Sequence, residues 1–144
     1  MRADLADSWV FWALLSALFA AGTAIFAKIG VENIDSDLAT LIRTLIVAAV
    51  LAGLLAATGR LQPTAVAPRT WVFLTLSALA TGASWLCYFR ALKIGDAARV
   101  APIDKLSVVA VALIGALALG ERLSPSNWLG VGMIAAGAVL VAMR

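Results

Sequence analysis

The stretch SWLCYFRALKIGDAARVAPIDKLSVVAVALIGALALGER, from Ser84 to Arg122, decides the fold of this chain. It ends one apolar segment, turns at Gly95-Asp96 and begins a second apolar segment with charged residues in its first turns. Both segments have the length and composition of helices that cross a lipid bilayer. An ionisable residue one or two turns inside such a helix indicates a functional site, because charged groups are costly inside a membrane.

The composition of the whole chain favours the same class of protein. Of 144 residues, 63% are hydrophobic and 13% are charged, and the mean hydropathy is +1.01. Soluble domains have roughly 45–50% apolar and about 25% charged residues. The sequence therefore predicts an integral membrane protein. The formal charge is +3, but the basic residues are scattered singly at segment ends, which favours anchoring at the membrane surface over nucleic-acid binding.

Residue counts exclude several kinds of site. The chain has no histidine and one cysteine, Cys87, so it can form neither an intrachain disulfide nor a Cys/His metal site. Nucleophilic machinery of the Ser-His or Cys-His kind is excluded for the same reason. We therefore expect no metal, no cofactor and no enzymatic activity.

Runs of about 20 apolar residues mark the expected membrane-crossing helices, because that length spans a hydrocarbon core of roughly 30 Å. In a single all-α domain over residues 1–144, these helices cover residues 9–27, 38–58, 70–92, 97–119 and 125–142. Asp4 and Asp7 precede the first run and argue against a cleaved secretory signal, which begins with basic residues. Asp37 is placed to cap the second helix, and Pro102 is expected to bend the fourth.

The basic residues leave the membrane orientation open. Five crossings put the two termini on opposite sides, and the exposed Lys and Arg residues then divide evenly between the sides. Orientation normally follows a Lys/Arg excess on the cytoplasmic side, so an even division favours insertion in both orientations. Counting the basic residues inside the spans as well gives one side an excess and places the N-terminus outside.

Four charged residues are expected inside the spans near one side of the membrane: Arg43, Arg90, Asp104 and Lys105. The helix directions give them similar shallow depths, so they are expected to converge on one polar pocket. Asp104 and Lys105 are adjacent and thus about 100° apart around a helix, which predicts that they do not pair with each other. Arg43 is the expected partner of Asp104. A backbone carbonyl, a substrate anion or water is expected for Lys105.

Two interpretations of these charges stay open. In the simpler one they form ion pairs with one another near the membrane surface and orient the helices. In the functional one they line a water-filled cavity and bind or couple to a solute; the three cations then favour anionic or zwitterionic solutes, with Asp104 as counter-ion or coupling group. Trp85 and Tyr88 lie on one face of the third span. They either anchor that helix at the membrane interface or stack on the substrate.

The chain also resembles a known family. Residues 91–141, ALKIGDAARVAPIDKLSVVAVALIGALALGERLSPSNWLGVGMIAAGAVLV, are similar to the carboxyl half of the EamA domain of the drug/metabolite transporter superfamily. The shared features are, in order, an ALxxG turn, a small-residue and Pro entry to the fourth helix, a GERLS-like turn and a Gly-rich fifth helix. The first half agrees, with AKIG closing the first helix and an Arg in the second. One domain instead of two makes the chain similar to the single-domain, five-helix branch, called the bacterial/archaeal transporter family.

This resemblance implies a secondary transporter or exporter of small metabolites in a prokaryotic inner membrane, working by alternating access between two five-helix repeats. A chain with one repeat then pairs as an inverted, antiparallel homodimer or with an oppositely oriented homologue. The related small multidrug resistance proteins keep a carboxylate in the middle of the first helix; residues 9–27 contain none, which leaves Asp104 as the proposed proton carrier. A non-transporting membrane subunit that anchors or stabilises a partner membrane protein is the alternative, and a lipid-modifying enzyme comes third.

Overall fold

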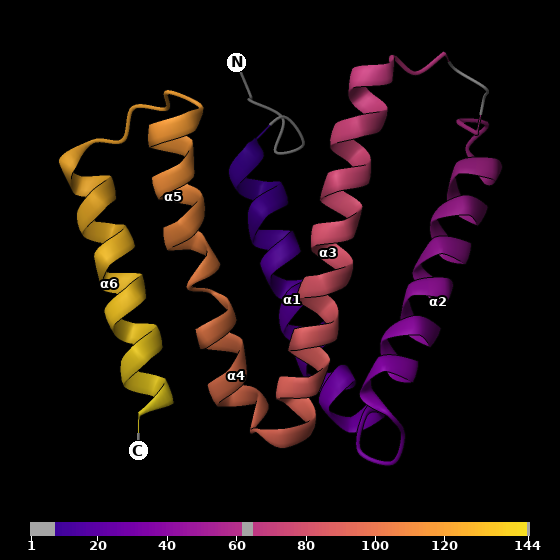
Figure 1. Cartoon of the computed structure of the whole chain (residues 1–144), viewed down its shortest axis with the longest axis horizontal. Coiled ribbons are helices and arrows are strands. Elements are labelled where there is room, and N and C mark those ends of the chain that lie inside the picture. Colours follow the sequence, from indigo (N-terminus) through magenta and orange to yellow (C-terminus); the bar gives the residue numbers. More distant parts are fainter. Residues whose placement is uncertain (1–7, 62–64, 144) are drawn as a thin grey trace. The chain divides into compact units, whose positions relative to one another are not determined.

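The chain folds into helices joined by short connections (Figure 1). The computed structural model describes residues 8–61 and 65–143. Its helices are α1 (Trp9–Gly30), α2 (Ser36–Ala57), α3 (Pro68–Ile94), α4 (Ala97–Asp104), α5 (Ser107–Ala118) and α6 (Pro125–Ala142). Because α4 and α5 together form one stretch, Ala97–Ala118, five stretches are long and apolar enough to cross a membrane. The prediction of an all-α protein with five transmembrane helices is thereby confirmed.

The helix boundaries lie within three residues of their predicted positions. Pro68 opens α3 and Pro125 opens α6, where a missing N–H does no harm because the first N–H groups of a helix have no intrahelical partner. Ser124 caps α6 by accepting a hydrogen bond from the N–H of Asn127 at 3.2 Å. Asp4 and Asp7, on which the argument against a cleaved signal rests, lie outside the described residues.

The start of α2 corrects one prediction. Asp35, not Asp37, is the N-cap: its carboxylate accepts from the N–H groups of Asp37 at 2.9 Å and Leu38 at 3.0 Å. The reason is the backbone at Asp35, which is extended (φ −63°, ψ 135°) and turns helical at the next residue. Asp37 is thus placed in the first turn, with its side chain available for a contact outside the helix.

The end of α2 is fixed by a glycine. Gly59 has φ +66°, a left-handed conformation that only glycine adopts without strain. Its N–H bonds to the carbonyl of Ala56 at 3.1 Å, and the N–H of Arg60 bonds to the carbonyl of Leu55 at 2.9 Å. These two bonds form a Schellman motif, which satisfies the last carbonyls of the helix and ends it.

The described chain forms two compact units. One contains the described residues of Met1–Phe26 and Ile94–Arg144, and the other is Ala27–Lys93. In the first unit α6 packs against α4 and α5. The guanidinium of Arg99 in α4 donates to the carbonyl of Ala142, the last residue of α6, at 2.9 Å; a cation is favourable there because the last carbonyls carry the negative end of the helix dipole. The prediction of one domain over 1–144 stays a prediction.

The fourth span is interrupted after Asp104 (Figure 1). Pro102 has no N–H to donate, and its ring crowds the preceding turn. At the break the chain tightens to hydrogen bonds between residues three apart: the N–H of Lys105 bonds to Pro102 at 3.1 Å and that of Leu106 to Ile103 at 3.0 Å. The span is therefore divided by a short break two residues after Pro102, and the bend predicted for it stays a prediction.

Candidate functional site

Arg43 lies against two aromatic rings. It is in α2, eight residues after Asp35, or about 12 Å along the helix. Its guanidinium carbon Cζ is 4.1 Å from the centroid of the Trp85 ring and 5.7 Å from that of Phe89. Trp85 and Phe89 are four residues apart on α3 and so share one helical face. Both contacts are cation–π interactions, which are strongest when the cation is removed from water.

One donor of this guanidinium is unpaired. The Nη1 atom of Arg43 is buried and has no hydrogen-bond partner in the described part of the chain. The ring faces attract the positive charge, but they do not replace a hydrogen-bond acceptor at the N–H edge. A buried, unpaired donor is destabilising, and more so when it is charged. Arg43 is therefore a cation with spare bonding capacity inside a membrane-crossing helix.

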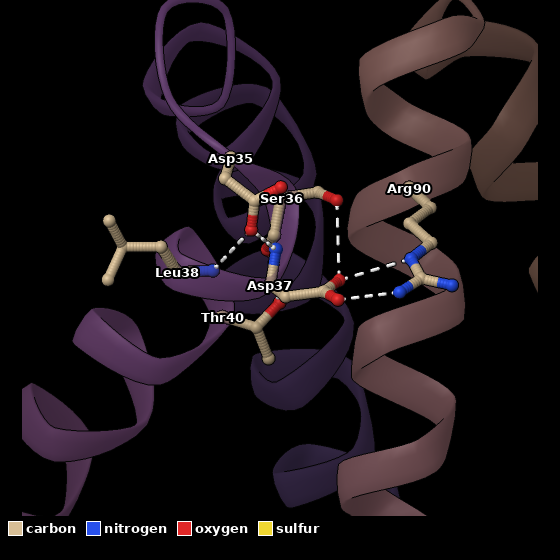
Figure 2. Close-up of polar contacts among 6 residues, drawn as sticks. All are labelled: Asp35, Ser36, Asp37, Leu38, Thr40 and Arg90. Carbon is tan, nitrogen blue, oxygen red and sulfur yellow. Dashed lines mark hydrogen bonds and ion pairs between the residues drawn. The ribbon is translucent and has the colours of Figure 1, made fainter.

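Arg90 makes a two-pronged ion pair with Asp37 (Figure 2). Its Nε donates to Asp37 Oδ1 at 3.1 Å and its Nη2 to Oδ2 at 2.5 Å. The Ser36 hydroxyl donates to the same Oδ1 at 3.4 Å. This side-by-side arrangement matches the fork of a guanidinium to the two oxygens of a carboxylate. Arg90 was expected to contribute positive charge to a pocket, but in the structure Asp37 compensates that charge.

Two lysines tie the connection between α1 and α2 to the end of α3. Lys28 Nζ donates to the carbonyl of Leu92 at 2.8 Å, and Lys93 Nζ donates to the carbonyl of Ile34 at 2.5 Å. The same region holds two side chains with no exposed surface, Val31 and Leu92 (0% each). Main-chain carbonyls at the end of α3 are good acceptors for a cation because they lack intrahelical partners. This end of Ala27–Lys93 is thus fixed by both packing and hydrogen bonds.

Asp104 and Lys105 form an ion pair at the break between α4 and α5. Lys105 Nζ donates to Asp104 Oδ2 at 3.2 Å. The prediction that these neighbours do not pair is therefore wrong. It took the 100° spacing to keep the two side chains apart, whereas Lys105 is the C-cap of α4 (φ −71°, ψ −5°), where the helix ends, and its long stem reaches the carboxylate.

The predicted site residues fall into the two units. Ala27–Lys93 contains Arg43, Trp85, Tyr88 and Arg90, and the other unit contains Pro102, Asp104 and Lys105. The Arg43–Asp104 pair and the shared polar pocket stay predictions. Phe89 and Asp37 were not predicted as partners. A signal existed for each, because Phe89 is one helical turn from Trp85 and Asp37 is an acid at a helix start on the side where α3 ends. In the part of the chain that the structure describes, no group of Cys, Asp and Glu side chains is placed to hold a metal ion.

Comparison with known proteins gives two matches to transporters. The chain matches the EamA-like transporter family over residues 7–143. It is also 64% identical over 140 residues to a Sinorhizobium sp protein described as an uncharacterized transporter in the cobO 3′ region, an alignment that covers 96% of this chain and 99% of that protein. No solved structure matches the chain. The family match includes all five membrane-crossing stretches.

Proposed function

Because the chain belongs to the EamA-like transporter family, we propose that this multi-pass membrane protein is a secondary transporter that exports a small metabolite. In this proposal it resides in a prokaryotic inner membrane and works by alternating access between two five-helix repeats. One chain supplies one repeat, so the second comes from an oppositely oriented copy or homologue.

The break between α4 and α5 is the observation that carries the proposal. Asp104 is seven residues after the start of α4, or about 10 Å along the helix, within the membrane-crossing stretch Ala97–Ala118. The side chains of Asp104 and Lys105 are 36% and 56% exposed. Broken helices and exposed charges at membrane depth are tolerated where they face a water-filled cavity or other protein, since lipid tails cannot pair the freed groups. A polar path through the membrane, which every transporter needs, accounts for both features.

Each site residue has a proposed role. Asp104 is the coupling group, and Lys105 is its counter-ion until a proton or solute displaces it. Arg43, Trp85 and Tyr88 bind the solute. Arg90, whose charge is compensated by Asp37, sets the position of α3 relative to the start of α2 and acts on the solute through the rings of α3.

The first experiment compares export by cells that carry the protein with export by cells that carry an empty vector. Mass spectrometry of the medium identifies solutes that accumulate only with the protein, and membrane levels are matched by an epitope tag. Asp104→Asn is expected to reduce export at least about tenfold, the range of a lost charged hydrogen bond. Asp96→Asn is the matched control, because Asp96 begins the same helix and its side chain makes no capping hydrogen bond.

Two results contradict the proposal. Unchanged export with Asp104→Asn at equal membrane level would remove Asp104 from the coupling step. A medium identical to that of the empty-vector cells, with the protein present in the membrane, would favour the non-transporting subunit.

The second experiment tests the inverted pairing. In a Cys87→Ser background, single cysteines are placed at Glu32, between α1 and α2, and at Ser126, in the first turn of α6. Five crossings put these positions on opposite sides of the membrane. A membrane-impermeant thiol reagent added to intact cells is expected to label a fraction of each. Labelling of one position alone would exclude a self-paired inverted dimer.

A further inference from the structure

The cations of unit Ala27–Lys93 and of the α4–α5 break differ in whether an acidic side chain pairs with them. Three cations were expected in one pocket, but Arg90 is paired with Asp37 and Lys105 with Asp104. Arg43 differs, because its Nη1 is buried without a hydrogen-bond partner among the described residues. Of the three cations, Arg43 is therefore the one with a buried donor left for a ligand.

The surroundings of Arg43 select the shape of that ligand. The Trp85 ring lies 4.1 Å from Cζ and the Phe89 ring 5.7 Å from it, so the aromatic faces attract the guanidinium charge and leave its N–H edge for an acceptor. A carboxylate, planar and with two oxygens, fits such an edge better than a single oxygen does. Phe89 is 3% exposed, so its ring is already covered by packing within the chain. Trp85 is only half-buried, so part of its ring surface is available to the carbon skeleton of a ligand.

We propose that Arg43 binds the carboxylate of a small, singly charged solute whose apolar part rests on Trp85. The inference rests on the proposed transport function and adds the class of substrate: monocarboxylates, not cations and not di- or tricarboxylates. One uncompensated guanidinium balances one negative charge. A second carboxylate on the solute would be desolvated without a partner, which is strongly unfavourable.

Binding by the purified protein tests this without measuring transport. The probes are butyrate, its neutral analogue butyramide and the dianion succinate, titrated into protein in an uncharged detergent while tryptophan fluorescence is recorded. Butyrate is expected to give a saturable change that is absent in Trp85→Phe. Butyramide and succinate are expected to bind at least about tenfold more weakly, since each loses or misplaces one charged hydrogen bond.

Variants assign the response to Arg43. Arg43→Gln is expected to abolish the butyrate response, and Arg43→Lys to weaken it because an ammonium lacks the planar fork. Arg69→Gln is the matched control: Arg69 also lies over a ring, with Cζ 5.8 Å from the centroid of Phe73, but it is exposed at the start of α3. Its removal is expected to leave butyrate affinity unchanged. Far-UV circular dichroism checks that each variant is folded.

Three outcomes overturn the inference. They are an unchanged butyrate response in folded Arg43→Gln, succinate binding as tight as butyrate binding, and a response to phosphatidylglycerol in mixed micelles without any response to butyrate. The last outcome would assign the Nη1 donor to a lipid phosphate, the other source of a singly charged anion. If Arg43→Gln does not fold, the ranking of the three probes on the unmodified protein decides alone. None of these results affects the export test, which depends on Asp104.

Discussion

Replacing Arg43 by methionine distinguishes a residue kept for binding from one kept for stability. The substitution retains a long apolar stem and removes the guanidinium. Two effects of opposite sign follow. The cation–π contact with Trp85, at 4.1 Å, is lost, and a desolvated contact of this kind is worth about 2 kcal/mol. The buried and unpaired Nη1 donor is also removed, which relieves roughly 1–3 kcal/mol.

The two effects nearly cancel. Arg43→Met is therefore expected to change the free energy of unfolding by no more than about 1 kcal/mol in either direction. The measurement is unfolding by sodium dodecyl sulfate from dodecyl maltoside micelles, followed by far-UV circular dichroism. Phe89→Ala serves as the positive control, because its ring is 3% exposed and truncation of a buried phenylalanine costs about 3–5 kcal/mol.

A loss of more than about 3 kcal/mol for Arg43→Met, the size seen when a buried ion pair is broken, would refute this reasoning. It would mean that the guanidinium is held by structural partners and that its Nη1 is not available to a ligand. A variant that is as stable as the original protein but does not bind butyrate would show that Arg43 is retained for binding.

Three further predictions concern the fold. Gly59→Ala is expected to destabilise the protein by about 1 kcal/mol because φ at Gly59 is +66°. Gly53→Ala, inside α2 with open space where a Cβ would lie, is expected to stabilise it by about 0.5–1 kcal/mol. Effects of equal sign in the same detergent unfolding experiment would contradict both predictions. Leu92→Ala, at a side chain with 0% exposure, is expected to lower the free energy of unfolding by about 2–5 kcal/mol. Leu79→Ala, at a side chain that is 67% exposed, is expected to lower it by less than about 0.5 kcal/mol. Equal losses would show that burial within the chain does not determine the loss of stability. Asp37→Asn weakens the two-pronged bond from α3 and is expected to speed hydrogen exchange in the connection before α2, measured by mass spectrometry. Unchanged exchange there would show that the lysine ties alone hold the connection.

The membrane spans could be read from the sequence because bilayer thickness fixes their length. The exact caps could not. Asp35 and Asp37 are both acids just before an apolar run, and both satisfy the residue preference for an N-cap. The choice between them depends on where the backbone changes from extended to helical, which is at Asp35. That point is set by the connection from α1 and its ties to α3, which no local pattern contains.

The charged residues inside the spans could be listed from the sequence, but their pairings could not. Arg90 finds its partner 53 positions away in Asp37, and a list of charges at helix ends does not assign such partners. The error at Asp104 and Lys105 has another cause. A regular helix was assumed through a segment in which α4 ends at Asp104, two residues after Pro102, and the reach of the long lysine stem was not considered.

The ties at the end of α3 differ in how they constrain the sequence. Lys93 bonds to the main-chain oxygen of Ile34, and every amino acid, proline included, supplies that oxygen. This bond therefore places no requirement on the side chain at position 34. The bond between Arg90 and Asp37 joins two side chains and is preserved only if both are kept or both change together. The start of α2 and the connection before it are thus held to α3 in two ways. The bond from Lys93 depends on one side chain, whereas the Arg90–Asp37 pair depends on two.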